Sequence, residues 1–192
     1  MLLLVGTTVF LVLSSRRLMA GWMANQGAVL MARVQLADFP SHQWEDGQDL
    51  SRLAPAQAWL ERAVHLDPAS RTANHRLGLI ALQRRDFTTA TRYLEAALHL
   101  DPSHYGVIKN LGYAYVWAGQ YDQAQPLLAQ IPEAKQELHN YNVWWQAQGR
   151  ADLAHQAQEM RTRLAGGTTR PATGFEALLT GKTFYSSRGS CL

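Results

Sequence analysis

The sequence predicts an all-α fold, in which stacked helix–turn–helix units form an α-solenoid behind an apolar N-terminal helix. The first observation is a repeat, because Asp67-Pro68 returns 34 residues later as Asp101-Pro102. The second is that apolar residues between these marks recur at three- and four-residue spacing, as on one face of a helix. The third is an uncharged stretch over residues 1–13, rich in Leu and Val.

The composition is typical of a folded domain of ordinary size with some additional segments. The chain has 192 residues, of which 47% are hydrophobic and 17% charged, so its middle should bury a core. Its net charge is +3, and most of its 18 basic residues are arginines scattered along the chain. A nucleic-acid binder concentrates such residues in a stripe, so we expect solvated helix faces and no nucleic acid. A basic nucleic-acid-associated helical protein remains an alternative that only the pI, ≈ 9.2, suggests.

The N-terminal residues predict a membrane anchor over residues 1–20. A helix of residues 1–13 reaches roughly 20 Å, against about 30 Å for the hydrocarbon core, and extending it brings Arg16 and Arg17 to the headgroup layer. The anchor is therefore either single-pass or peripheral, or the second half of a longer helix that begins upstream. Arg16, Arg17 and Arg33 all follow the apolar stretch, which places the repeat domain in the cytoplasm by the positive-inside rule.

Apolar residues at helical spacing predict the next two helices over residues 21–36 and 56–66. Between them, prolines, a glycine and four acidic residues predict a loop over residues 38–55. Pro55 suits the first turn of the helix that follows.

Two pairs of helices form the clearest part of the pattern. The residue before a proline is pushed out of the helical region, so each Asp-Pro pair predicts the end of a helix. The predicted helices cover residues 71–85, 87–100, 105–118 and 121–130. Beyond these the pattern decays, with helices predicted over residues 133–148 and 151–164 and a flexible, Gly-, Thr- and Ser-rich tail over residues 165–192.

The repeated residues resemble the tetratricopeptide repeat, whose pattern is W-x2-L-G-x2-Y, then A-x3-F, then P. The two clear units, within residues 67–132, supply Leu77-Gly78, Ala90, Leu94 and Pro102, and then Leu111-Gly112, Tyr115, Ala124 and Leu128. Both units depart from the pattern, because Asn74, Ala81 and Ile108 replace aromatic residues and Gln136 replaces the second proline. The resemblance extends to a degenerate first repeat over residues 21–66, interrupted by the acidic loop, and a degenerate capping repeat over residues 133–164.

In this family the first helix of each pair lines a concave groove that holds a peptide or a helix of a protein partner. Carried over by position, the resemblance implies the groove residues His75, Arg76, Leu79, Lys109, Asn110, Tyr113, Trp117, His139 and Asn140. Asn110 and Asn140 lie at positions where other members of the family use asparagine to hydrogen-bond the backbone of a bound peptide. For Tyr113 and Trp117, packing between repeats is the alternative.

No group of residues suggests catalysis. Cys191 is the only cysteine, so the chain has no thiolate cluster for a zinc ion. There is no phosphate-binding glycine loop and no serine-nucleophile motif. We therefore predict no enzyme activity, no metal, no cofactor and no small-molecule substrate.

These observations favour a membrane-tethered scaffold that binds a protein partner in its groove. The alternative is the C-terminal repeat region of a larger polytopic membrane enzyme of glycan-handling type, which the abrupt apolar start suggests. A fold of this kind does not by itself identify the partner.

Overall fold

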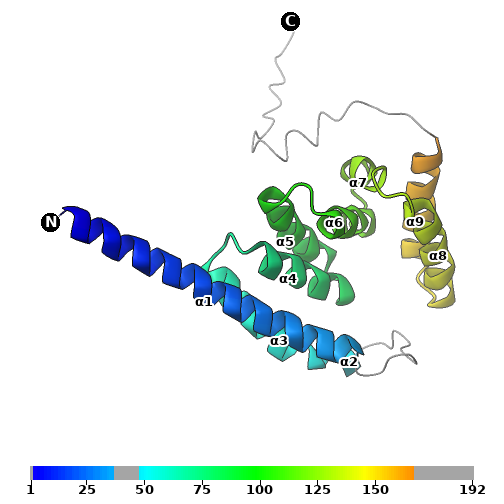
Figure 1. The fold of residues 1–192 in the computed structure, drawn as a ribbon. Helices are drawn as coiled ribbons and strands as arrows, with labels where there is room; N and C mark the ends of the chain where they lie inside the picture. Colours follow the sequence, from blue (N-terminus) through cyan, green and yellow to red (C-terminus); the bar gives the residue numbers. More distant parts are fainter. Residues whose placement is uncertain (1, 37–47, 167–192) are drawn as a thin grey trace, which may run out of the picture. The chain divides into compact units, whose positions relative to one another are not determined.

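A computed structural model describes the backbone of residues 2–36 and 48–166 and the side chains of residues 14–36 and 50–166. These ranges contain helices and no strand (Figure 1). The helices are α1 (Leu2–Leu36), α2 (Gln48–Arg52), α3 (Ala54–Leu66), α4 (Arg71–Gln83), α5 (Phe87–Leu100), α6 (Tyr105–Trp117), α7 (Tyr121–Leu128), α8 (Ala134–Ala147) and α9 (Ala151–Ala165). The predicted all-α fold is confirmed. The chain divides into unit 1 (Met1–Ala114) and unit 2 (Tyr115–Leu192), a boundary that falls inside α6.

The ends of the repeat helices follow from local chemistry. Asp67 and Asp101, each followed by proline, adopt extended backbone angles (φ −139°, ψ 94° and φ −149°, ψ 85°) and end α3 and α5. Ser70 and Asp86 precede α4 and α5 and cap them, because each side-chain oxygen accepts a hydrogen bond from the backbone N–H three residues later. The residues that recur every 34 positions therefore mark where the helices end and begin.

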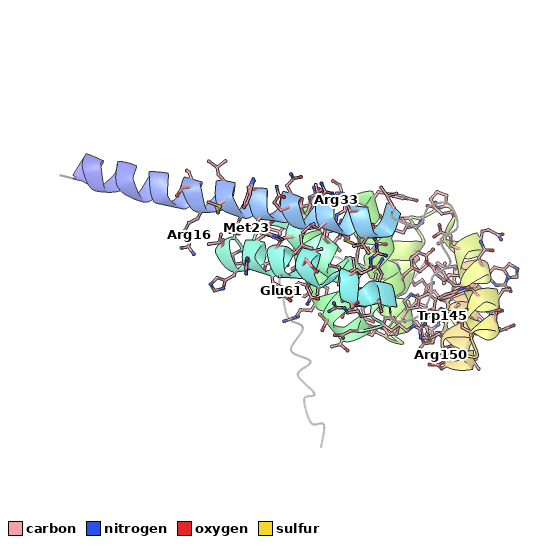
Figure 2. All side chains as sticks on the ribbon, turned by 90° about the horizontal axis from the view of Figure 1, so that it is seen from below. Arg16, Met23, Arg33, Glu61, Trp145 and Arg150 are labelled. Atoms are coloured by element: carbon pink, nitrogen blue, oxygen red, sulfur yellow. The ribbon has the colours of Figure 1, made fainter. Side chains whose placement is uncertain are left out.

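Two pairs of helices in unit 1 approach closely at glycines. A Cβ atom on Gly78 of α4 would lie 2.5 Å from Cγ of Leu94 on α5, so only glycine allows this contact. The longer pair is built in the same way, because a Cβ on Gly27 of α1 would lie 2.6 Å from Cγ of Leu60 on α3. Helices α1 and α3 lie side by side along the C-terminal part of α1 (Figures 1 and 2). The assignment of residues 21–66 to a first repeat stays a prediction.

Part of the predicted loop is helical. Residues 37–47 lie outside the described part of the chain, but α2 forms over Gln48–Arg52 and α3 begins at Ala54, so the loop predicted over residues 38–55 ends earlier than expected. This segment is ordered as helix because its apolar side chains are covered: Leu53 is buried, and Leu50 packs against the core that α1, α3 and α4 share. Pro55 occupies the first turn of α3, as predicted.

The buried Asn74 shows how a polar residue replaces an aromatic one of the repeat pattern. Its Nδ2 donates hydrogen bonds to the carbonyl oxygens of Pro68 and Ser70, both at 3.0 Å. A buried amide is stable only when its polar atoms are bonded, so Asn74 ties the start of α4 to the preceding turn.

Unit 2 contains α7, α8 and α9, and α9 contacts both of the others. Helix α7 contains Pro126, which has no N–H to bond the carbonyl oxygen of Asp122 one turn earlier. None of these three helices has a side-chain cap at its first residue, in contrast to α4 and α5. The Arg163 side chain on α9 forms ion pairs with Asp122 on α7 at 3.0 Å and with Glu159 on its own helix at 2.9 Å.

Two predicted segments fall largely outside the described residues. The side chains of residues 1–13, which make up most of the predicted anchor, are not among those described, and neither are residues 167–192 of the predicted tail. Within the described part of the chain, no helix combines the length and the hydrophobicity needed to cross a bilayer.

Candidate functional site

The nine predicted groove residues lie on the first helix of three successive pairs. Helix α4 carries His75, Arg76 and Leu79, α6 carries Lys109, Asn110, Tyr113 and Trp117, and α8 carries His139 and Asn140. Because the boundary between the units falls inside α6, the residues of each unit are described separately.

In unit 1 the structure brings together His75 and Asn110. The Asn110 side chain donates a hydrogen bond from Nδ2 to Nε2 of His75 at 3.0 Å, which requires a neutral imidazole with its proton on Nδ1. His104, at the start of α6, lies edge-on against the His75 ring, with ring centroids 5.3 Å apart. We call His75, His104 and Asn110 the histidine cluster.

The surroundings of His75 oppose its protonation. Burial of the ring, followed by the charges of His104, Arg76 and Arg71, lowers the pKa of His75 from 6.5 to about 4. The hydrogen bond from Asn110 therefore persists at neutral pH, and it holds the Asn110 amide in one orientation. Because Nδ2 is the atom that bonds His75, the amide oxygen of Asn110 is left as its hydrogen-bond acceptor.

His104 was missed by the sequence interpretation, although the repeat contained a signal for it. It lies 34 residues after Ser70 and performs the same task, since its Nδ1 accepts a hydrogen bond from the backbone N–H of Val107 at 3.2 Å. A helix-capping position occupied by histidine rather than serine places an aromatic ring at the start of α6. That ring reaches His75 on the neighbouring first helix.

The other predicted residues of unit 1 differ from one another in how far they are buried. Arg76 and Lys109 are half-buried, and Leu79 packs against the apolar core shared by α1, α3 and α4. Tyr113 is only 4% exposed. Burial at this level favours packing for Tyr113, which is the alternative that the sequence left open.

Trp117 belongs to an aromatic cluster in unit 2. It is 7% exposed, and its ring lies edge-on to Tyr141 and Trp145, with centroids 5.3 Å and 6.0 Å away. Trp144 and Trp145 are in contact as well, at 4.3 Å. These contacts favour a packing role for Trp117 too.

His139 lines an open hollow of ≈ 430 Å³ in unit 2. Its other lining residues are Lys135, Gln136, Arg161, Thr162 and Ala165. Arg161 donates a hydrogen bond to Nδ1 of His139 at 3.0 Å, and Asn140 accepts one from Gln136 at 3.1 Å. The hollow is basic, but its lining side chains lie mostly at the exposed surface of α8 and α9.

Several arginines form ion pairs with acidic residues of the same chain. Arg71 pairs with Asp101 at 3.6 Å, and Arg150 pairs with Asp152 at 2.8 Å. Such pairs agree with the interpretation of the basic residues as solvated helix faces. Among the residues with described side chains, no three of the types His, Cys, Asp and Glu lie close enough together to hold a metal ion.

Comparison with known protein families agrees with the repeat. The sequence model of the tetratricopeptide repeat family matches residues 81–156. Solved structures that match include one named "MamA MSR-1 C2", with a TM-score of 0.41 and 17% sequence identity over 80% of this chain and 94% of that chain. No curated protein matches the sequence.

Proposed function

Because this chain belongs to the tetratricopeptide repeat family, we propose that it is a membrane-tethered scaffold that holds a peptide or a helix of a protein partner. The observation that carries this proposal is the set of paired helices whose first members, α4 and α6, bring His75 and Asn110 into contact. The proposal assigns the protein no chemistry of its own. Its task is to hold a partner near a membrane.

The histidine cluster is the part of unit 1 best suited to peptide binding. A bound peptide presents backbone N–H groups that need acceptors, and the amide oxygen of Asn110 supplies one. His75 stabilises that amide in a single orientation, so the peptide does not have to order it on binding. Lys109 precedes Asn110 on the same helix and carries a positive charge.

The basic hollow around His139 offers a second contact in unit 2. Lys135 and Arg161 give it a positive character, and a partner segment with acidic residues would complement them. His139 and Asn140 remain predicted partner-binding residues.

The proposal is tested by crosslinking pull-down of the full chain from native membranes. Combined Lys109→Ala and Asn110→Ala changes remove a charge and an amide from α6. We expect recovery of the bound partner to fall about tenfold, which corresponds to the loss of roughly one charge-assisted hydrogen bond.

A matched control changes Thr88 and Arg92 to Ala on α5, the second helix of the same pair. Both residues are exposed, and the double change also removes one charge and one polar side chain. Partner recovery should be unchanged. Equal recovery with both double variants would reject the groove as the binding site.

A further inference from the structure

Helix α1 is apolar on two faces, and only one of them is covered. The covered face carries Ala20, Ala24, Gly27 and Met31, which are buried against the rest of unit 1. The other face exposes large apolar side chains: Leu18 is 76% exposed, Trp22 51%, Val29 40% and Leu36 65%. A helix that is apolar all round normally has neighbours on every side.

These exposed residues follow the spacing of a coiled-coil seam. Residues 18, 22, 25, 29, 32 and 36 alternate steps of four and three, and they are Leu, Trp, Asn, Val, Ala and Leu. The repeat of seven keeps one stripe facing a second helix, which inserts its side chains between those of the first. Within residues 18–36, the buried positions Ala20, Ala24, Gly27 and Met31 do not belong to the seam, and of the seam residues Trp22 touches α3 at one edge.

The polar residues on this face favour a protein helix over lipid as its cover. Asn25 lies within the seam, and Gln26, Arg33 and Gln35 flank it. Burial of these groups in hydrocarbon is costly, because lipid tails cannot form hydrogen bonds. A partner helix can instead supply a polar group opposite Asn25.

A second copy of α1 supplies that group. In a parallel pair Asn25 lies opposite Asn25 of the second copy, where each amide can donate and accept one hydrogen bond. Arg33, the single charged flanking residue, falls opposite Ala28 of the second copy, so no like charges meet.

We propose that the open face of α1, defined by Leu18, Trp22, Asn25, Val29, Ala32 and Leu36, binds the same face of a second copy of this chain in a parallel coiled coil. An isolated helix of this length is marginal in water, but α1 is already held by α3 over this stretch. Trp22 contacts Trp59 of α3 edge-on at 5.2 Å, so the second copy covers the part of Trp22 that α3 leaves exposed. In Figure 2, Arg16 lies where α1 extends beyond α3, and both copies would extend from the same end.

Sedimentation of the full chain in density-matched detergent micelles tests the pairing. We expect the protein mass of two copies, and we expect Val29→Glu to weaken dimerisation by a factor on the order of 100, because it places a charge in the seam. The matched control is Val143→Glu on α8, which is also an exposed helical valine, 54% exposed, and which should leave the dimer intact. A wild-type chain that sediments as one copy, or a Val29→Glu variant that remains dimeric, would overturn the proposal.

Disulfide trapping tests the orientation. In a Cys191→Ser background, which removes the only native cysteine, Val29→Cys should form an intermolecular disulfide within the dimer. Thr88→Cys on the exposed surface of α5 should not. The absence of the Val29 crosslink would overturn the parallel arrangement. Binding of a monomeric wild-type chain to zwitterionic or anionic vesicles, abolished by Val29→Glu, would identify lipid as the cover and reject the second copy.

Discussion

The imidazole of His75 illustrates how one residue acquires its properties from contacts far away in the chain. Its hydrogen-bond donor lies 35 residues later on α6, and burial is the main reason that its pKa falls to about 4. In an unfolded chain the pKa of histidine is about 6.5. Between these two values the unfolded state binds more protons than the folded state, so the free energy of unfolding decreases as the pH falls.

We predict that the free energy of unfolding decreases by about 1–2 kcal/mol between pH 7 and pH 4 because of His75 alone. The full pKa shift would correspond to roughly 3 kcal/mol, but solvent reaches the half-buried ring and reduces the effect. Urea unfolding followed by circular dichroism measures it. His75→Gln should remove this part of the pH dependence, and His65→Gln, a change at an exposed position of α3, should not. Parallel pH profiles for His75→Gln and the wild type would contradict the interpretation.

The turns between paired helices depend on one left-handed residue each. Gly119 has φ 73° and Gly149 has φ 68°, whereas the corresponding residue of the first clear unit is Arg85, with φ 60°. A residue with a Cβ atom is strained in this conformation by roughly 1–2 kcal/mol. The space around Gly119 is open, so a substitution there tests the backbone alone.

Gly119→Ala should therefore lower the free energy of unfolding by about 1 kcal/mol. The reciprocal change, Arg85→Gly, should raise it or leave it unchanged, because the strain is relieved while the unfolded chain gains freedom. Thermal or urea unfolding of both variants measures the difference. A Gly119→Ala variant as stable as the wild type would show that the turn relaxes away from positive φ.

The close contact between α1 and α3 depends on one residue without a side chain, Gly27. Gly27 lies where a Cβ atom would meet both Leu60 and, at 3.0 Å, the carbonyl oxygen of Ala56. The side chain can adjust, but the backbone of α3 cannot move without disturbing the core that α1, α3 and α4 share. The close approach of these helices therefore requires glycine.

Gly27→Ala should destabilise unit 1 by about 1–3 kcal/mol through overpacking. The control is Gly21→Ala on the same helix, where a Cβ meets nothing within 4 Å and where we expect a gain of about 0.5–1 kcal/mol from helix propensity. Hydrogen exchange of α1 and α3 localises the effect. We therefore expect the free energy of unfolding to fall with Gly27→Ala and to rise with Gly21→Ala. A decrease of similar size with both substitutions would rule out close packing as the cause.

The position of the chain relative to a membrane concerns the whole molecule. Removal of residues 1–13 should move the protein from the membrane fraction to the soluble fraction of lysed cells, since these residues form an uncharged stretch rich in Leu and Val. Fractionation followed by immunoblotting measures the distribution. Identical partitioning of the full and shortened chains would refute the tether and leave the scaffold without its proposed location.

The helix pairs could be predicted from the sequence because their causes are local. The Asp-Pro pairs exclude helical backbone at the preceding residue, Asp86 caps the helix that follows it, and the repeat period positions the close contact of Gly78 with Leu94. Each of these depends on residues within one repeat. The predicted boundaries of the helices from α4 to α9 agree with the structure to within two residues.

The tertiary structure decided which of the predicted residues are buried. Tyr113 and Trp117 are buried, His104 joins His75 and Asn110, and one face of α1 stays open although it is apolar. Helical spacing places a side chain on a face, but whether that face is covered depends on other helices, which are distant in the sequence. Burial, the pKa of His75 and the open seam of α1 follow from those distant contacts, and so they could be recognised only in the folded chain.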